Sequence, residues 1–280
     1  PAAWIPILRA DRIVMAGDHR QLPPTVKAAA ELSNTLFEKM ITRHAGADCV
    51  FFLDTQYRMR PEIVAFSNRE FYDGRLVTDP SVTRRDANGD GPGGIAWKAP
   101  CVFIDTAGCD FNEELEPESE SYRNSGEARL MAAVLEQTAP VAFETGWSIG
   151  VIATYRNQVS LLREVLETLF ETLFEKPRGS EGASPSRSGD SLMEVDTVDA
   201  FQGREHDLFC ISMVRSNDAC ETGFLSESRL MNVALTRARR LLIVVGDSAT
   251  LSNHPFYARF LEHVDRHGDY RSAYEFLEIV

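Results

Sequence analysis

The sequence predicts an α/β protein, a parallel sheet with helices on both of its faces. Short apolar runs alternate along the chain with segments of helix length, which is typical of this class. The runs are rich in Val, Ile, Leu and Phe and mostly lack polar alternation, as expected of strands buried on both faces. Strands are therefore expected at 13–16, 50–53, 101–104, 149–153, 208–214 and 241–245.

Helices are expected between these strands, at about 61–71, 124–138, 156–175, 228–240 and 255–278. In the third, apolar residues from Val159 to Leu173 recur at steps of three and four, which predicts a stripe that faces the core. Segments 84–94 and 176–190 are rich in small and loop-forming residues and are expected to be loops. Segment 110–120 carries six acidic residues and no basic one, which predicts a solvated loop that repels anions.

Length and composition exclude some classes of protein. The 280 residues suffice for one large domain or two modest ones, and a hydrophobic fraction of 44% allows a packed core. The longest apolar runs fall far short of the roughly 20 residues of a membrane-spanning helix. The net charge of −13 excludes a basic coat over the whole surface, although a local basic groove remains possible.

The cysteines predict a reducing compartment. There are five, an odd number, at wide spacings and without a Cys-x-x-Cys pair. A disulfide framework or a structural zinc site is therefore not expected. An intracellular protein of the cytoplasm or nucleus fits this pattern.

The first polar cluster, at 17–24, reads GDHRQLPP and follows an expected strand. Gln21 can donate and accept hydrogen bonds, so it could contact a terminal phosphate or align a water molecule. A structured turn with a surface glutamine is the alternative.

The second cluster, at 54–61, reads DTQYRMRP and ends on Pro61, which suits the first turn of a helix. Tyr57 offers a flat face to a base, and the guanidinium fork of Arg58 matches a phosphate. An arginine that caps or pairs locally is the alternative. The third cluster, TVDAFQGRE at 197–205, packs polar side chains around Gly203, which permits close backbone approach of a ligand.

The fourth cluster, at 228–240, reads SRLMNVALTRARR. On a helix, Arg237 falls on the same stripe as the apolar residues at 230, 233 and 234. A buried arginine needs an anionic partner, which could be a local carboxylate or a phosphate. Arg239 and Arg240 are expected to be ordinary cations near the end of this helix.

Taken in order, these clusters resemble motifs III (17–24), IV (56–59), V (198–205) and VI (232–239) of superfamily 1 helicases, in the up-frameshift-like branch 1B. Segment 154–158, TYRNQ, is similar to the motif that lies between IV and V. The resemblance implies two RecA-like domains that hold ATP and Mg²⁺ between them and bind single-stranded DNA or RNA. Residues 1–50 would then be the tail of the first domain, and residues 51–280 the second domain.

The resemblance also implies a role for individual residues. Gln21, Arg58 and Arg237 would act on the γ-phosphate, the two arginines as arginine fingers. Tyr57, Gly203 and Glu205 would line the nucleotide. The nucleic-acid strand would be contacted by Pro23, Thr154, Tyr155, Asn157 and Thr197.

Two motifs of such an enzyme are absent from the sequence. A Walker A motif needs a lysine after glycine, and none of the four lysines follows one. The Asp-Glu pair of motif II, which would hold Mg²⁺, is also absent. We therefore expect the chain, which starts at Pro1, to be the C-terminal part of a helicase. It would need the N-terminal RecA-like half as a partner and would not hydrolyse ATP alone.

Two other functions remain open. The chain could be a non-catalytic RecA-like module that binds nucleic acid or serves as a scaffold. An unrelated nucleotide-binding enzyme is the third interpretation, but it leaves the order of the four motifs unexplained.

Overall fold

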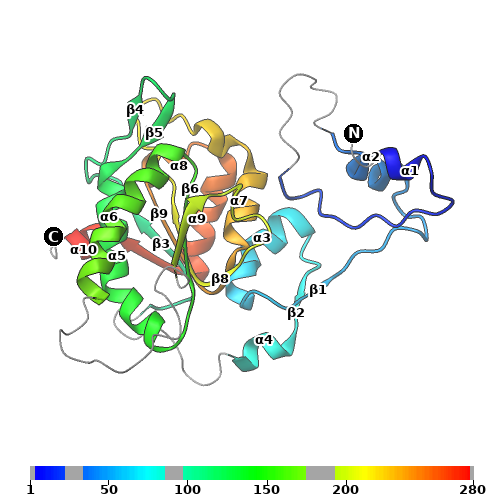
Figure 1. Cartoon of the computed structure of the whole chain (residues 1–280), viewed down its shortest axis with the longest axis horizontal. Coiled ribbons are helices and arrows are strands. Elements are labelled where there is room, and N and C mark those ends of the chain that lie inside the picture. The colour runs from blue at the N-terminus through cyan, green and yellow to red at the C-terminus, as the bar shows by residue number, and fades with distance from the viewer. Residues whose placement is uncertain (1–3, 23–33, 86–96, 175–192, 278–280) are drawn as a thin grey trace, which may run out of the picture. The chain divides into compact units, whose positions relative to one another are not determined.

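A computed structural model describes residues 4–22, 34–85, 97–174 and 193–277 of the chain (Figure 1). The chain divides into two compact units, Pro1–Leu53 and Asp54–Val280. The first unit contains helices α1 (Trp4–Ile7) and α2 (Leu36–Arg43). Thr35 caps α2, since its hydroxyl accepts a hydrogen bond from the backbone N–H of Glu38 at 3.1 Å.

The prediction of strands at 13–16 and 50–53 is wrong. Both segments lie outside regular secondary structure, and their apolar side chains are open to solvent, with Val14 97% and Leu53 85% exposed. A strand forms only where a neighbouring strand supplies hydrogen-bond partners. No strand in the described part of the chain pairs with either segment.

The second unit is built on a six-stranded sheet in the order β10-β3-β9-β8-β6-β7 (Figure 1). All of its neighbouring strands are parallel, so the predicted α/β class is confirmed. The strands are β3 (Cys101–Asp105), β6 (Ile149–Ala153), β7 (Met193–Thr197), β8 (His206–Ser212), β9 (Ala238–Gly246) and β10 (Asp269–Ser272).

Helices cover both faces of this sheet (Figure 1). On one face, α5 and α6 pack on alternate strand residues such as Val102 and Ile104. On the other face, Phe103 of β3 meets Phe260 of α9 edge to face at 6.3 Å. The longer helices are α3 (Pro61–Tyr72), α5 (Ser125–Glu144), α6 (Arg156–Phe174), α7 (Ser228–Leu235) and α9 (Pro255–His267).

The short elements of this unit lie around the sheet. Strands β1 (Thr55–Gln56) and β2 (Val77–Thr78) pair in parallel, and β4 (Glu114–Glu116) and β5 (Ser121–Arg123) form a hairpin. The short helices are α4 (Pro80–Arg85), α8 (Ser248–Leu251), α10 (Tyr274–Leu277) and the 3-10 turn η3 (Gly223–Ser226). The loops expected at 84–94 and 176–190 lie almost entirely outside the described residues.

Two of the predicted helices end earlier than expected. The helix predicted at 255–278 stops at His267 and is followed by β10, because the backbone of Gly268 is extended. Gly268 lies against β3, where a Cβ atom would approach the Cys101 carbonyl oxygen to 2.5 Å. The helix predicted at 228–240 stops at Leu235. There the Thr236 hydroxyl donates to the Asn232 carbonyl at 2.7 Å, a bond that competes with helix continuation.

Gly150 of β6 allows close packing against β8, where it pairs with Phe209. A Cβ atom at this position would lie 2.6 Å from the Phe209 ring and 2.8 Å from the His206 ring. We predict that Gly150→Ala lowers the free energy of unfolding by about 1–3 kcal/mol through overpacking, measured by chemical denaturation. Gly17→Ala is the control, since its Cβ would contact Phe37 at an ordinary 3.5 Å. Equal unfolding curves for the two variants would contradict this account of β6.

Candidate functional site

The predicted site residues of the second unit fall on two opposite edges of the sheet. Because all neighbouring strands are parallel, every strand begins at one edge, the amino edge, and ends at the other, the carboxyl edge. Arg58, Glu205 and Arg237 gather where β8 and β9 begin. Thr154 and Thr197 lie where β6 and β7 end. The length of a strand, about 20 Å for the longer ones, separates the two groups.

At the amino edge, the structure brings both predicted arginine fingers to Thr236. Arg58 donates from Nη1 to the Thr236 carbonyl oxygen at 3.0 Å. Arg237 donates from Nη2 to the Thr236 hydroxyl at 3.3 Å. The side chain of Arg58 also forms an ion pair with Glu205. Arg58 and Arg237, which are distant in sequence, therefore both donate a hydrogen bond to Thr236.

The turn before α3 holds Arg58 in place. The side-chain oxygen of Gln56 accepts the backbone N–H groups of Arg58 at 2.9 Å and Met59 at 2.8 Å. Its amide nitrogen donates to the Met59 carbonyl at 2.7 Å. The Arg60 N–H then bonds to the Arg239 carbonyl at 3.1 Å. These bonds fix the turn to the start of β9.

Arg237 is only 2% exposed. Its Nε donates to the Val233 carbonyl at 2.9 Å, and its Nη1 donates to the Arg204 carbonyl at 3.2 Å. The predicted placement on a helix is wrong, because the residue lies in the turn between α7 and β9. The bond to Val233 nevertheless keeps the helical spacing of four residues, so the side chain turns inward. These acceptors, with the Thr236 hydroxyl, are neutral oxygen atoms that orient the guanidinium group.

The same edge carries further charges. Arg239 lies 3.7 Å from a carboxylate oxygen of Glu205, and Arg240 lies 3.3 Å from Asp207. These two arginines were expected near a helix end, but they belong to β9. Because Glu205 is partly exposed, its ion pairs contribute little to stability.

Tyr57 and Gly203, the other predicted nucleotide contacts, are exposed. Gly203 has a φ of +88° and no atom within 4 Å of a Cβ built on it. Its backbone is therefore accessible in a conformation that other residues rarely adopt.

At the carboxyl edge, Thr197 is the last residue of β7 and Thr154 directly follows Ala153, the β6 residue that pairs with Thr197. The Thr154 hydroxyl donates to the Met213 carbonyl at 3.4 Å. Tyr155 is buried, and its hydroxyl accepts a bond from Arg215 Nη1 at 3.2 Å. Tyr155 thus supports the neighbouring loop, whereas the two threonines are half exposed.

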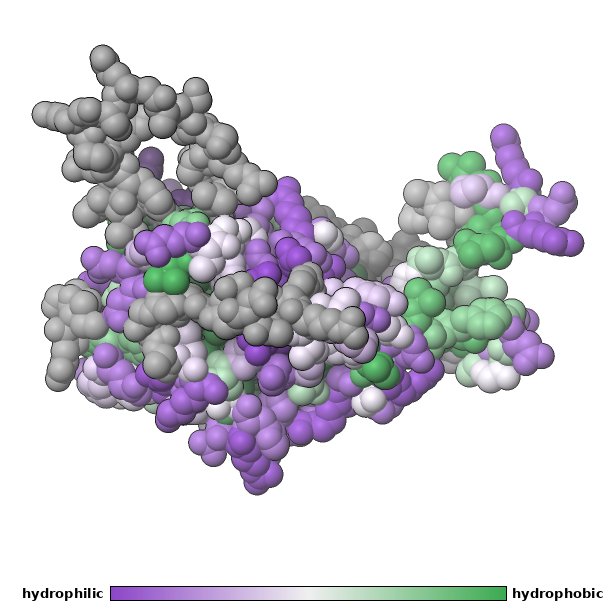
Figure 2. Space-filling model, turned by 90° about the horizontal axis from the view of Figure 1, so that it is seen from below, coloured by the Kyte–Doolittle hydropathy of each residue, from purple (hydrophilic) through white to green (hydrophobic). Residues whose placement is uncertain are grey.

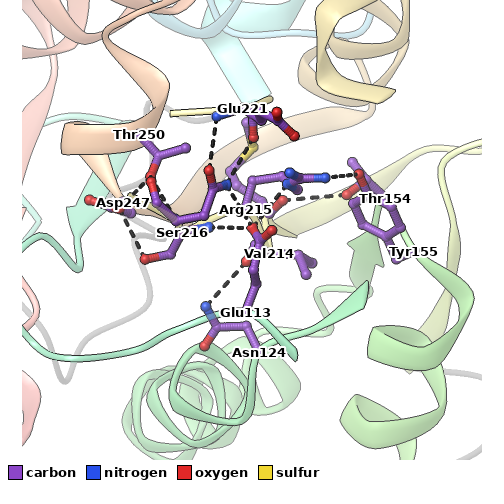
Figure 3. A network of polar contacts seen from close by, with 12 residues as sticks. Glu113, Asn124, Thr154, Tyr155, Val214, Arg215, Ser216, Glu221, Asp247 and Thr250 are labelled. Carbon is purple, nitrogen blue, oxygen red and sulfur yellow. Dashed lines mark hydrogen bonds and ion pairs between the residues drawn. The ribbon is translucent and has the colours of Figure 1, made fainter. Parts of the chain in front are cut away.

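Arg215 is the centre of a buried polar network at this edge (Figure 3). Its Nε forms an ion pair of 2.9 Å with Glu113, and its guanidinium lies over the Tyr122 ring at 4.3 Å. Glu113 also accepts the backbone N–H of Ser216 at 2.8 Å. The Ser216 hydroxyl donates to Asp247 at 3.0 Å. The network connects the segments that follow β3, β6, β8 and β9.

Val214, before this arginine, has a φ of +72°, a strained value for a β-branched residue. Two buried side chains hold it. The Glu127 carboxylate accepts the Val214 N–H at 2.9 Å, and the Asn124 amide donates to the Val214 carbonyl at 3.2 Å. Burial raises the pKa of Glu127 to about 8, although bonds from Ser212 and Val214 oppose the rise.

Asn157 is engaged by the β4–β5 hairpin. Its amide nitrogen donates to Glu116 and, at 2.8 Å, to the Ser119 hydroxyl. Its backbone N–H donates to the Ser121 hydroxyl at 3.2 Å. Most of the acidic segment 110–120 is exposed, as expected. It is not entirely a loop, because it contains β4, and the side chain of Glu113 is only 9% exposed.

The first unit holds the two remaining predicted residues. Gln21 donates from its amide to Asp18 at 3.1 Å. Pro23 lies outside the described residues. The unit also has an apolar pocket lined by residues such as Ile13, Phe37 and Phe51, and Figure 2 shows hydrophobic surface on it.

Sequence reasoning missed Arg215, Glu113 and the exposed Phe224 as parts of the carboxyl edge. The signal for Arg215 was its position directly after a buried strand, in a run of polar residues. Glu113 carried no signal of its own, because it stands within an acidic run. Phe224 stands between Gly223 and the buried Leu225, and a sequence does not show which of two neighbouring apolar residues is exposed.

Comparison with known proteins shows the family. A family model described as an AAA domain matches residues 32–249, and a second model of the same description matches residues 1–29. The chain belongs to this family and to the superfamily 1B helicases that its motifs resemble.

The chain is similar to several named proteins. It is 39% identical to DNA-binding protein SMUBP-2 of Mesocricetus auratus, over 99% of the chain and 26% of that protein. It is 34% identical to the DNA polymerase alpha-associated DNA helicase A of Saccharomyces cerevisiae, over 90% of the chain and 37% of that protein. The chain is 32% identical to regulator of nonsense transcripts 1 of Dictyostelium discoideum, over 94% of the chain and 19% of that protein. The chain spans about a quarter of the length of the first of these relatives.

Segments 105–109 and 273–277 resemble those of the immunoglobulin-mu-binding-protein helicase, in agreement with the match to SMUBP-2.

Among the described residues, no helix has both the length and the apolar character needed to cross a membrane. The same residues contain no group of three or more His, Cys, Asp or Glu side chains that could hold a metal ion.

The raised pKa of Glu127 predicts that the free energy of unfolding depends on pH. A carboxyl group with a raised pKa takes up a proton on folding, so its contribution to stability falls as the pH rises from about 4.5 to about 8. Glu127→Gln keeps an oxygen that accepts the Val214 N–H but does not titrate. We predict that the variant gains stability relative to the parent across this window, by roughly a few kcal/mol, measured by urea denaturation at several pH values.

Glu136→Gln is the control, on the exposed side of the same helix, and it should follow the parent at every pH. A constant difference between Glu127→Gln and the parent from pH 4.5 to pH 8 would contradict the raised pKa.

Proposed function

We propose that this chain is the C-terminal part of an ATP-dependent nucleic-acid helicase or translocase. In this proposal it supplies two arginine fingers to the nucleotide and polar contacts to a single strand. The observation that carries the proposal is the hydrogen bond from Arg58 to the Thr236 carbonyl oxygen, which holds Arg58 beside the residue that precedes Arg237. Family membership supports a helicase-type domain, and several relatives are named as helicases.

ATP suits the amino edge by charge and by geometry. Transfer of a phosphoryl group spreads negative charge over its oxygens, and fixed guanidinium groups stabilise that charge. The turn of Gln56 fixes Arg58, and backbone carbonyls orient Arg237. The phosphate would compete with Glu205 for Arg58, so Glu205 would hold the arginine until a nucleotide binds. Tyr57 would lie beside the adenine, and Gly203 beside the nucleotide.

This chain would not hydrolyse ATP alone. Walker A and the acidic pair of motif II are absent from its sequence, so Mg²⁺ would be held mainly by the N-terminal RecA-like half. That half would also place Gln21 at the γ-phosphate. The exposed apolar residues of the first unit, such as Val14 and Leu53, support such a partner, because strands of that half would cover them.

A single strand of DNA or RNA would lie along the carboxyl edge. Thr154 and Thr197, which lie at the ends of the neighbouring strands β6 and β7, would contact its backbone, and the turn at Pro23 would add a contact. Tyr155 would act mainly through the loop that it supports, and Asn157 would first have to leave the hairpin. The net charge of −13 implies weak binding that is sensitive to salt.

A non-catalytic RecA-like module is the second candidate function. The hydrogen bonds that bury Arg237 would then be structural. For either function we infer an intracellular protein, and the free state of all five cysteines supports a reducing compartment.

If Arg58 and Arg237 act as arginine fingers, replacing either one should lower the turnover of ATP. In a protein that joins this chain to a first RecA-like half with Walker A and motif II, Arg58→Ala and Arg237→Ala should each lower kcat for ATP by about 10³-fold or more. A coupled assay measures the turnover. Arg266→Ala is the control, since this exposed arginine forms an ion pair with Glu262 one turn away on α9, and it should retain full activity.

We also predict that the chain alone shows no ATP turnover above background in the same assay. Turnover by the chain alone that Arg237→Ala abolishes would contradict this prediction. Full activity of both arginine variants in the joined protein would contradict the proposed arginine fingers, whereas a joined parent without ATP turnover would favour the non-catalytic module.

A further inference from the structure

Phe224 presents its ring to solvent at the carboxyl edge of the sheet. It is 67% exposed, whereas the next residue, Leu225, is fully buried. The segment beneath the ring is anchored, because the Tyr257 hydroxyl donates to the Leu225 carbonyl at 2.7 Å and the Leu225 N–H donates to the Thr222 carbonyl at 3.0 Å. The exposed ring is therefore carried by a fixed turn.

The ring is the exposed end of an aromatic row. Its centroid lies 5.5 Å from that of Tyr155, and Tyr155 lies 5.3 Å from Tyr122. The Arg215 guanidinium covers the far end of the row, 4.3 Å from the Tyr122 centroid. Figure 3 shows Tyr155 and Arg215 pointing toward one another beside Thr154. The row thus leads from the buried network to the surface next to a predicted strand contact.

Gly223 fixes the position of Phe224 in this row. A Cβ atom at Gly223 would lie 2.5 Å from Arg215 Nη1 and 2.6 Å from the Tyr155 hydroxyl, and its φ is +54°. The backbone therefore rests directly on Arg215 and Tyr155. The neighbouring Phe224 ring cannot shift far without disturbing that contact.

We propose that Phe224 is a stacking platform for an unpaired nucleobase of the strand that runs past Thr154 and Thr197. This inference rests on the proposed function, because it needs a single strand at the carboxyl edge. A flat aromatic face stacks on a base of any identity. Stacking also suits a chain of net charge −13, in which attraction to phosphates is limited and an uncharged base meets no repulsion.

Two carboxylates close to this segment have cationic partners. Glu227, which caps α7, is held by Arg229 through two hydrogen bonds of 2.9 and 2.8 Å. Glu113 is paired with Arg215 beneath the row. The repulsion of these two carboxylates toward a strand is therefore reduced by the arginines that they contact.

The test is a fluorescence anisotropy titration of the 280-residue chain with a labelled oligothymidylate and with an abasic oligonucleotide of equal length. We expect Phe224→Ala to weaken binding of oligothymidylate roughly tenfold. Phe224→Tyr keeps the flat face and should bind like the parent. Tyr274→Ala is the matched control, since this tyrosine is 56% exposed and follows β10, at the far side of the sheet.

The abasic oligonucleotide separates stacking from a structural effect. If Phe224 stacks on a base, Phe224→Ala and the parent bind the abasic strand equally. An equal loss of affinity of Phe224→Ala for both oligonucleotides would overturn the proposal. Unchanged binding of oligothymidylate by this variant would also overturn it and would indicate that the exposed ring contacts a protein partner. If the parent binds neither oligonucleotide, the proposed strand contact fails as well. If the parent binds and only the Phe224 effect is missing, this inference alone fails.

Discussion

The parallel pairing of the six strands is the constraint on which the rest of the second unit depends. Because every strand runs in the same direction, residues that precede strands and residues that follow them gather on opposite edges. The amino edge collects Arg58, Glu205 and Arg237, and the carboxyl edge collects Thr154 and Thr197. A nucleotide and a strand would thus occupy different edges. Segment 198–205 joins the edges directly, and its Phe201 is buried against Phe209 at 5.3 Å, so this connection is well packed.

A buried arginine lies at each of the two edges. At the carboxyl edge, Arg215 meets Glu113 within the protein, which compensates both charges in place. At the amino edge, the hydrogen bonds that orient Arg237 go to carbonyl and hydroxyl oxygens. The first arrangement builds a rigid loop around the strained Val214. The second orients a cation for the phosphate that we propose.

The sequence predicted the sheet class and four of its six strands, because those strands are continuous apolar runs. It missed β7, whose apolar and polar residues alternate at the edge of the sheet, and β10, which reads as part of a helix. It also placed strands at 13–16 and 50–53, where the apolar pattern is present but no described strand pairs with it. For the site, the motifs indicated the arginines. They could not show that Arg237 lies beyond its helix or that Tyr155 is buried, because both depend on tertiary packing.

Hydrogen–deuterium exchange of the chain with and without a single-stranded oligonucleotide tests the separation of the two edges most directly. The account predicts that the strand slows exchange in peptides that contain Thr154, Thr197 and Phe224. Peptides that cover 56–60 and 236–240, at the amino edge, should exchange at unchanged rates. Protection of 56–60 and 236–240, with none around Thr154 and Thr197, would contradict the assignment of the strand to the carboxyl edge.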